Sequence, residues 1–315
     1  MNKGTTTKTI IFMILVMILS FCPNSLFVSA AEPAPGVLIL KVDRDDVLQL
    51  PARFRTAKDV FQTTPSDGKI PSRKGLEKLN ISGSSFYSQL EFVKLLSKLP
   101  TNRLVILDLR AESHGYLNGI GVSWYSAYKR ANWGKNTAQV EAAERKLLDA
   151  SLKGVVKLAH LGDDKSIVSE NELTVVSATT ERDIADLMGV KYVRIPVTDY
   201  TKPTDENVDQ FLNFYKALPK DAWLHLHCEA GEGRTTIFMA MIDMIHNAKK
   251  VSYDDIMIRQ WLLGGQDIRT ATSKDPWKND AYKGRAAFTK HFYEYVVENP
   301  ELSISWTEWA KQHNY

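Results

Sequence analysis

The stretch Trp223-Leu-His-Leu-His-Cys-Glu-Ala-Gly-Glu-Gly-Arg-Thr-Thr236 decides the fold of this chain. Leucines and histidines alternate from Leu224 to His227, a pattern that predicts a strand with one apolar face. A short loop with two glycines follows, and residues 237–245 are apolar enough to form a buried helix. A strand, a glycine-bearing loop and a helix predict an anion-binding turn, because the loop N–H groups converge and the helix N-terminus carries partial positive charge.

Cys228 stands at the mouth of this turn, and Arg234 follows after five intervening residues. A nucleophilic cysteine needs positive potential to ionise at neutral pH, and a helix N-terminus with a nearby guanidinium supplies it. The planar guanidinium also fits two phosphate oxygens, so attack on phosphorus through a phosphocysteine suits the arrangement. The alternative is a small buried cysteine beside an ordinary turn. That alternative does not account for the glycines, the arginine and the threonine at fixed offsets.

Residues 228–234 are called the cysteine loop below. The pattern His-Cys-x5-Arg-Thr is the signature of the protein tyrosine phosphatase superfamily, and it indicates phosphate-ester hydrolysis without indicating which ester. We expect Cys228 to be the nucleophile, Arg234 the phosphate clamp, Thr235 a hydrogen-bond partner of the thiolate, and His227 a structural support. The remaining loop residues are expected to surround the phosphate with backbone N–H groups: Glu229, Ala230, Gly231, Glu232 and Gly233.

The chain has 315 residues, of which 44% are hydrophobic and 24% charged, an ordinary composition for a globular protein with a sizeable core. Residues 1–30 are typical of a signal peptide, with Lys3 and Lys8 before an apolar run and small residues before Ala31. A lipoprotein signal at Cys22 is disfavoured by the bulky residue before it, and an uncleaved anchor is the other alternative. We therefore expect a secreted or periplasmic protein with no stable membrane anchor after cleavage.

Removal of residues 1–30 leaves Cys228 as the single cysteine of the mature chain, so an internal disulfide framework is excluded and a catalytic thiol is favoured. The formal net charge falls from +3, since two lysines and no acid are lost, and the mature chain is nearly neutral. That charge gives no general case for nucleic-acid binding. No histidine and carboxylate cluster has convincing metal-ligand spacing, so we expect no metal and no other cofactor.

Strands and helices alternate along residues 31–315, which predicts an α/β fold with a parallel or mixed sheet and the cysteine loop at a strand C-terminus. We expect one phosphatase-type catalytic domain over this range. Thr204 is expected to cap the helix that follows it, with Asp205 and Glu206 in the first turn, where the helix dipole favours acids. Asp199 follows the predicted strand 192–197 and has no such structural explanation. A departing alkoxide needs a proton, so Asp199 is our candidate general acid. The alternative is a turn-forming aspartate.

The chain resembles the protein tyrosine phosphatase-like phytases, or cysteine phytases, of bacteria. The motif Glu112-Ser-His-Gly-Tyr-Leu117 is more specific to that family than the cysteine loop is. Further matching stretches extend over most of the mature chain: Leu50–Thr56, Ile81–Ser85, Asp108–Gly119, Val122–Tyr125, Thr198-Asp199, Asp221–His225, Arg259-Gln260, Gly264-Gly265, Trp277-Lys278 and Phe292-Tyr293.

The resemblance implies a phosphatase-type domain with a central mixed sheet flanked by helices and a small inserted β-rich subdomain. It implies stepwise removal of phosphates from myo-inositol hexakisphosphate and lower inositol polyphosphates without a metal. It assigns Cys228, Arg234 and Asp199 to nucleophile, clamp and acid. It also implies substrate contacts by Arg55, Asn118, Lys165, Tyr200, Lys278 and Arg285. This chain departs from the family pattern at Asn118, Asp164, Tyr200 and Glu232, which leaves its positional preference open.

Two other functions stay open on the sequence. A protein tyrosine or dual-specificity phosphatase shares the cysteine loop, but one phosphotyrosine does not need several basic phosphate contacts. A catalytically silent phosphate-binding module is disfavoured by the intact cysteine, arginine and aspartate. The oligomeric state is not indicated by the sequence.

Overall fold

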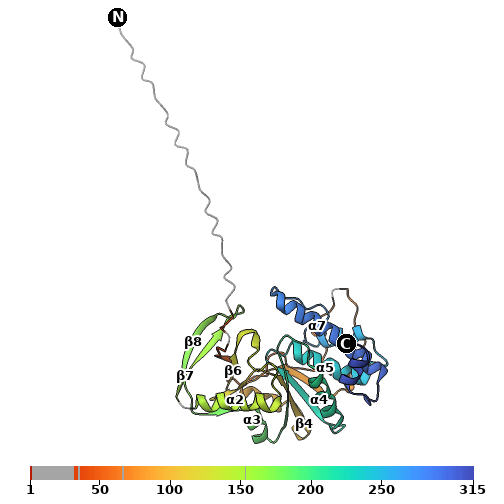
Figure 1. Ribbon diagram of the computed structural model, residues 1–315, viewed down its shortest axis with the longest axis horizontal. Helices are drawn as coiled ribbons and strands as arrows, with labels where there is room; N and C mark the ends of the chain where they lie inside the picture. Colours follow the sequence, from red (N-terminus) through yellow and green to blue (C-terminus); the bar gives the residue numbers. More distant parts are fainter. Residues whose placement is uncertain (2–31, 35, 66, 153) are drawn as a thin grey trace.

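The computed structural model describes residues 1, 32–34, 36–65, 67–152 and 154–315. Its strands form two sheets, one of five strands and one of six, and helices pack around them (Figure 1). The predicted α/β class with a central mixed sheet and a β-rich part is confirmed. The signal peptide predicted for residues 1–30 lies outside the described residues except for Met1. Within the described residues, none of the helices combines the length and the apolar character that a membrane crossing requires.

The five-stranded sheet carries the cysteine loop. Its order is β10-β4-β11-β3-β2, in which β11 lies between β4 and β3 and runs parallel to both. The strand β2 joins the edge antiparallel to β3, so the sheet is mixed. All six positions of β11 are buried, as central parallel strands require. The bounds are β2 Arg55–Thr56, β3 Ile81–Ser85, β4 Leu104–Arg110, β10 Lys191–Val197 and β11 Trp223–Cys228.

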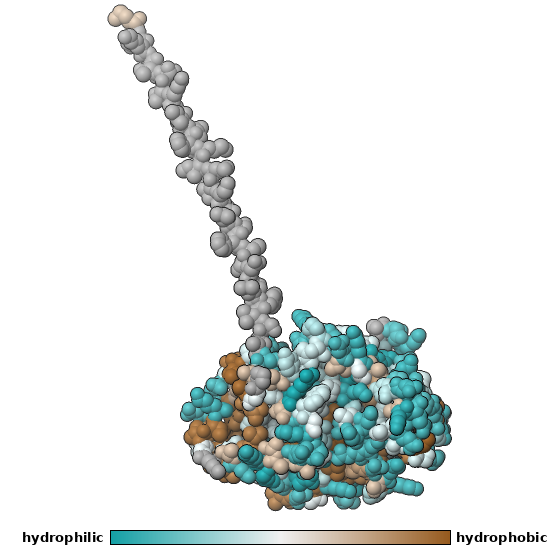
Figure 2. Space-filling model, in the orientation of Figure 1, coloured by the Kyte–Doolittle hydropathy of each residue, from teal (hydrophilic) through white to brown (hydrophobic). Residues whose placement is uncertain are grey.

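The six-stranded sheet has the order β8-β7-β1-β6-β5-β9 and supplies the opposite side of the site. Five of its strands come from the chain between β4 and β10, and β1 joins them from the N-terminal side. The hairpin β7–β8 forms the outer edge (Figure 1). Apolar side chains are exposed there, among them Val155, Ile167 and Val168, and they colour that end of the surface brown (Figure 2). The bounds are β1 Ile39–Arg44, β5 His114–Leu117, β6 Ile120–Tyr125, β7 Val155–Leu161, β8 Ile167–Thr174 and β9 Ala178–Thr179.

The helices begin at side-chain caps that the sequence partly revealed. Thr204 caps α4 by accepting a hydrogen bond from the backbone N–H of Asn207 at 3.2 Å, as its position before two acidic residues predicts. The helix α5 follows the cysteine loop and is buried along most of its length between the sheet, α6 and α7. The bounds are α1 Gln89–Leu96, α2 Thr137–Ser151, α3 Glu181–Leu187, α4 Asp205–Lys216, α5 Gly233–Asn247, α6 Tyr253–Leu262, α7 Pro276–Glu298 and α8 Trp306–Gln312, with short 3-10 turns η1 Leu76–Lys78, η2 Thr101–Arg103 and η3 Ala127–Lys129.

One feature of the fold differs from the sequence interpretation. Residues 81–85 contain three serines and a glycine, a composition that we interpret as a helix cap, but they form the buried strand β3 beside β11, and Ser88 is the cap of α1. The serines of β3 can be buried in a strand because Ser82 and Ser84 hydrogen-bond to the two ring nitrogens of His225 at 2.9 and 3.0 Å. The tryptophans at 306 and 309 are buried in α8 and pack into the core.

Candidate active site

The cysteine loop joins the end of β11 to the start of α5, and Cys228 is 2% exposed. The hydroxyl of Thr235 donates a hydrogen bond to Sγ of Cys228 at 3.2 Å, as the sequence predicts for a thiolate partner. Gly231 has a φ of 73°, and a Cβ there would lie 2.5 Å from the backbone of Ser84 and Ser85. Only glycine lets the loop approach β3 this closely. The loop therefore has the tight, N–H-lined form that an anion site needs.

Arg234 contacts two carboxylates, those of Glu112 and Asp199. Its Nη1 and Nη2 donate to the two oxygens of Glu112 at 2.7 and 2.9 Å, a two-pronged pairing that fixes the guanidinium plane. Nη1 also donates to the carbonyl of Val197 at 3.0 Å. Nη2 lies 3.2 Å from Oδ1 of Asp199, which places the candidate acid at the phosphate clamp. The structure thus brings the predicted clamp and acid together.

Asp199 also contacts a residue that the sequence analysis missed. Nζ of Lys129 donates to Oδ2 of Asp199 at 2.6 Å, and the same ammonium pairs with Glu229 of the cysteine loop. Burial of the Asp199 carboxyl favours its neutral form, but Arg234 and Lys129 outweigh burial and hold the pKa of Asp199 below its ordinary value. The ionised form of the Asp199 carboxyl is therefore favoured in this arrangement.

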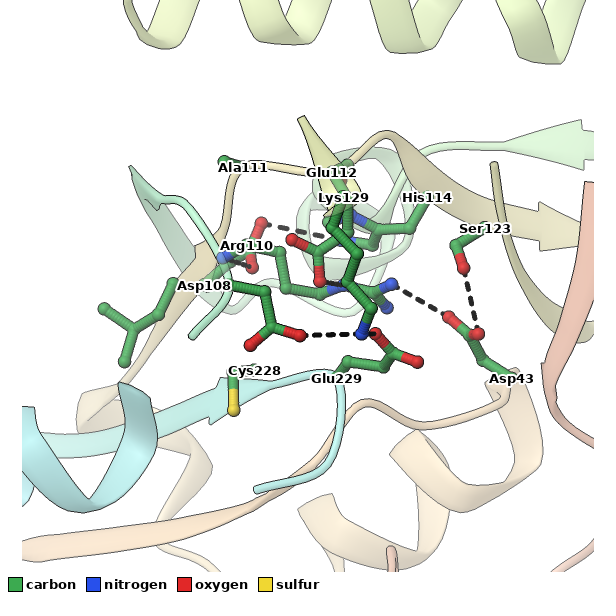
Figure 3. A network of polar contacts seen from close by, with 12 residues as sticks. Asp43, Asp108, Arg110, Ala111, Glu112, His114, Ser123, Lys129, Cys228 and Glu229 are labelled. Carbon is green, nitrogen blue, oxygen red and sulfur yellow. Dashed lines mark hydrogen bonds and ion pairs between the residues drawn. The ribbon is translucent and has the colours of Figure 1, made fainter. Parts of the chain in front are cut away.

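These contacts belong to a closed ring of alternating charges, called the charge ring below. Four cations and four anions each touch two neighbours, and the ring returns to its first member. Figure 3 shows one arc of it, in which Arg110 reaches Asp43 and Lys129 lies against Glu229. In order, the members are Lys41, Asp43, Arg110, Glu112, Arg234, Asp199, Lys129 and Glu229.

Three further cations lie around the cysteine loop, and none has an ion-pair partner in the part of the chain that the structure describes. Arg55 is fully buried and donates to Thr236 Oγ1 at 3.2 Å. Arg285 donates to Gln266 at 3.1 Å, and a side chain at Gly233 would collide with its guanidinium. Lys165 lies in the turn between β7 and β8 beside Glu229. These three are called the open cations.

An aromatic rim borders the same side of the site. Tyr200 follows Asp199 and meets the edge of Trp277 at a centroid distance of 5.4 Å. The ammonium of Lys278 lies 4.8 Å from the Tyr200 ring, and that of Lys129 lies 5.3 Å from it. Lys278 also pairs with Asp275 at 2.5 Å near the surface. Tyr200 and Lys278 are therefore close to the acid, as the resemblance implies.

Three residues named from the sequence have other surroundings. Asn118 is a turn residue at the β5–β6 hairpin, and its amide bonds to the backbone of Thr174, Val176 and Ser177 at 2.8 to 3.0 Å. Asn118 therefore has a structural role at this turn, and its expected substrate contact stays a prediction. Asp164 is exposed and accepts hydrogen bonds from Ser166. Glu232 pairs with Arg53 at the loop surface.

His227 lies in a buried group of carboxylates and aromatic side chains. Its Nε2 is 2.9 Å from Oε1 of Glu181, a residue of the first turn of α3. Ligand atoms of Asp108, Glu181 and His227 lie within 4.8 Å of one another, a spacing that a metal ion could use. Protein donors already occupy those acids, since Tyr192 donates to Asp108 at 2.8 Å and Tyr87 donates to Glu181. The expectation of no metal or cofactor stays a prediction.

Sequence reasoning did not assign five members of the charge ring: Lys41, Asp43, Arg110, Glu112 and Lys129. The sequence contains a signal for Glu112, because this residue begins the family-specific motif and follows a predicted strand end. Lys129 stands in a short turn with a positive φ of 57°, next to Tyr128 at 53°, and nothing in that segment marks it. Lys41 is one of many strand lysines. Only the two sheets together bring these residues to the cysteine loop.

Comparison with known proteins places this site among related ones. The family model for PTP-like phytases, described as inositol hexakisphosphate, matches residues 107–246. A PTP-like phytase from Bdellovibrio bacteriovorus is similar with a TM-score of 0.69 and 33% identity, covering 89% of this chain and 97% of that one. The PTP-like myo-inositol phosphatase from Mitsuokella multacida, solved with myo-inositol-(1,3,4,5)-tetrakisphosphate, gives a TM-score of 0.85 at 40% identity.

Some of these relatives are longer than this chain. The Mitsuokella match covers 90% of this chain and 49% of that one, so the chain spans about half of its relative. The effector protein hopD2 of Pseudomonas syringae pv. tomato is 30% identical over 262 residues, which are 79% of this chain and 56% of that protein.

Proposed function

The chain belongs to the family of protein tyrosine phosphatase-like phytases, and from this premise we propose that it hydrolyses inositol polyphosphates. The proposed substrates are myo-inositol hexakisphosphate and its lower phosphates, and the reaction passes through a phosphocysteine. The observation that carries the proposal is the placement of three open cations around a complete cysteine, arginine and aspartate set. One phosphate group occupies the cysteine loop, and the additional cations suit a substrate that carries several more.

In the first step, Sγ of Cys228 attacks phosphorus and a P–O bond to the inositol ring breaks. The Thr235 hydroxyl steadies the thiolate, and the loop N–H groups with Arg234 hold the phosphate oxygens. Asp199 gives its proton to the departing alkoxide oxygen. The incoming phosphate takes the Nη2 side of Arg234 that Asp199 contacts in the free enzyme, so the carboxyl loses a cation and gains an anionic neighbour. Both changes favour the protonated acid.

In the second step, water attacks the phosphocysteine, the S–P bond breaks, and inorganic phosphate leaves. Asp199, now ionised, takes a proton from that water and returns to its acid form. Glu112 keeps the clamp oriented through both steps, because its two oxygens accept from both Nη1 and Nη2 of Arg234. Over the two steps, one phosphoryl group passes from the inositol oxygen to Sγ of Cys228 and then to water.

We also propose that the protein is exported, to the periplasm or outside the cell. The support is the sequence of residues 1–30, which has the basic start, apolar run and small residues of a signal peptide. N-terminal sequencing of the protein from a secreting culture tests this proposal, and we expect the mature chain to begin at residue 31. An unprocessed N-terminus would contradict it.

The substrate is tested by phosphate release from myo-inositol hexakisphosphate and from a phosphotyrosine peptide, side by side, in the presence of a chelator. The protein used is the chain from residue 31 onward. We expect the inositol substrate to have the higher kcat/KM. Release from the peptide alone would make the protein a tyrosine phosphatase. Loss of activity in chelator would contradict the metal-free mechanism.

A further inference from the structure

A cavity of about 450 Å³ lies at the end of the five-stranded sheet opposite the cysteine loop, and it is called the distal cavity below. Its volume is within the range of small-molecule sites. Ile81 and Leu224, at the first turns of chain in β3 and β11, form part of its wall, whereas Cys228 is the last residue of β11. Roughly 13 Å of strand therefore separates the cavity from the nucleophile. A ligand in the distal cavity would leave the cysteine loop accessible.

The distal cavity has an aliphatic wall that is continuous with the main core of the protein. The aliphatic residues of this wall come from the segments around β3, β11 and α5: Leu79, Ile81, Leu218, Leu224, Ile242 and Ile245. The ring of Tyr215 also lies in the wall, but it is stacked on Phe211 at 5.6 Å and meets the edge of His246 at 6.1 Å. Since these neighbours already pack against that ring, the wall suits a flexible hydrocarbon chain better than an aromatic ligand.

The charged residues in the wall of the distal cavity are cationic. They are Lys78, Lys216 and Lys220, and no carboxylate side chain is among the described residues that line the cavity. None of these lysines has an ion pair with another described residue. All three are exposed, so water and salt screen their charge, and the aliphatic wall would supply most of the binding free energy. The lysines would select the charge of the ligand.

One of the three lysines is fixed at the cavity by a strained turn. The ammonium of Lys216 donates to the carbonyl of Leu302 at 3.1 Å, which uses one of its three N–H groups and leaves two for an anion. Leu302 has a φ of 50°, a left-handed conformation that a bulky residue seldom adopts. Its N–H donates to the carbonyl of Asn299 at 2.9 Å, and that turn holds the conformation. The turn thus presents Lys216 to the end of a ligand.

We propose that the distal cavity binds a medium-chain fatty acid anion, with the hydrocarbon chain against the aliphatic wall and the carboxylate at Lys216. This inference goes beyond the proposed function and does not depend on it. An inositol polyphosphate fits the distal cavity poorly, because burying its polar groups against aliphatic side chains is unfavourable. A neutral hydrocarbon would leave the lysines without an anionic partner. A carboxylate on an aliphatic chain satisfies both parts of the wall.

The test measures binding of octanoate, decanoate and 1-decanol by isothermal titration calorimetry, below the concentrations at which they form micelles. The protein is the chain from residue 31 onward. We expect decanoate to bind about fifteenfold more tightly than octanoate, since two more methylenes are buried. Saturating decanoate should leave KM for p-nitrophenyl phosphate unchanged, because the two sites lie at opposite ends of β11.

Two variants separate the carboxylate contact from the apolar contact. Lys216→Met should weaken decanoate binding by about threefold to fivefold and leave 1-decanol binding unchanged, because only the ionic contact is lost. Leu218→Asp places a carboxylate in the aliphatic wall and should weaken binding of both ligands by more than about tenfold. Lys191→Met, an exposed lysine at the start of β10 outside the cavity wall, is the matched control and should change neither.

Three results would overturn the fatty acid site and leave the proposed function intact. They are an affinity that does not increase with chain length, equal decanoate affinities in Lys216→Met and Lys191→Met, and competitive inhibition by decanoate, which would place it at the cysteine loop. If Leu218→Asp does not fold, the exposed position Lys216 and the chain-length series still decide the matter. Failure to release phosphate from the hexakisphosphate would refute the proposed function alone.

Discussion

The charge ring and the open cations both lie around the cysteine loop and differ in how their charges are balanced. Burial alone would lower the pKa of the ring's cations, but the carboxylates outweigh it and raise the pKa values of Lys41, Arg110, Lys129 and Arg234. Burial is not offset in the same way for the open cations, so it lowers the pKa of Arg55 to about 10 and also lowers those of Lys165 and Arg285.

This difference separates two tasks. The charge ring is neutral by itself and contains the clamp and the acid, so it can hold their geometry before substrate binds. The open cations carry charge at a cost in solvation that the protein does not compensate. Anionic groups of the substrate compensate it on binding, which favours ligands with several phosphates. Catalysis and selection are thus assigned to neighbouring but distinct groups.

The nucleophile provides the largest expected effect. Cys228→Ser should reduce kcat by more than about a thousandfold on every phosphate ester, because the covalent step has no other nucleophile. Binding of the hexakisphosphate should survive, since both charged groups remain, and calorimetry with this variant measures it. Turnover at the wild-type rate would refute the covalent mechanism.

The acid separates substrates by their leaving groups. Asp199→Asn should lower kcat on the hexakisphosphate by about a hundredfold or more, within the usual range for general acid catalysis. The loss on p-nitrophenyl phosphate should be much smaller, because its leaving group needs no proton. Equal losses on the two substrates would assign Asp199 to holding Arg234 rather than to proton transfer.

Removing the Glu112 carboxylate from the charge ring should affect all substrates alike. Glu112→Gln removes the charge that fixes Arg234, and we expect kcat/KM to fall by about a hundredfold on both hexakisphosphate and p-nitrophenyl phosphate. The free energy of unfolding should fall by about 3 kcal/mol, because buried guanidinium charge loses its partner. Glu170→Gln, at an exposed position of β8, is the control and should leave denaturant unfolding unchanged.

A cation outside the ring should affect only the polyphosphate. Lys278 contacts Tyr200 at the rim and pairs with the partly exposed Asp275. Replacing Lys278 therefore leaves no buried charge without a partner. Lys278→Met should lower kcat/KM on the hexakisphosphate by about tenfold, the worth of one charge-assisted contact. Steady-state kinetics with p-nitrophenyl phosphate should show little change. A large loss with the monoester would place Lys278 in the catalytic group.

The smallest effect on activity is expected at Asn118. Its amide ties the β5–β6 turn to residues 174–177, so Asn118→Ala should cost about 1 to 2 kcal/mol of unfolding free energy. Activity per folded molecule should stay within twofold of the wild type in this variant. A selective rise in KM for the hexakisphosphate would restore Asn118 to the substrate site.

The sequence predicted the elements whose signals are local. The cysteine loop, the cap at Thr204 and the buried helix after Arg234 each depend on neighbours along the chain. The strands β5 to β8 were not located individually. Every position of β5 is buried, whereas nearly every position of β8 is exposed, so neither strand alternates between polar and apolar residues. The β-rich part was expected only through the family resemblance.

The charge ring was beyond sequence reasoning for a different reason. Its members come from segments near residues 41–43, 110–112, 129, 199 and 229–234, and their pairing depends on how the two sheets meet. The chain has 40 lysines and arginines and 37 acidic residues, and the sequence does not indicate which of them pair. The family resemblance supplied the open cations because they match family positions. It also supplied Asn118, whose amide bonds to the backbone at a turn and whose substrate contact stays a prediction.

The separation of catalysis by the charge ring from substrate selection by cations outside it is tested most directly by one paired measurement. The ratio of kcat/KM for myo-inositol hexakisphosphate to that for p-nitrophenyl phosphate should be measured in the wild type, Glu112→Gln and Lys278→Met. The account predicts that Glu112→Gln lowers both rates and leaves the ratio within about threefold, whereas Lys278→Met lowers the ratio about tenfold. A ratio that changes equally in both variants would contradict the separation of catalysis from selection.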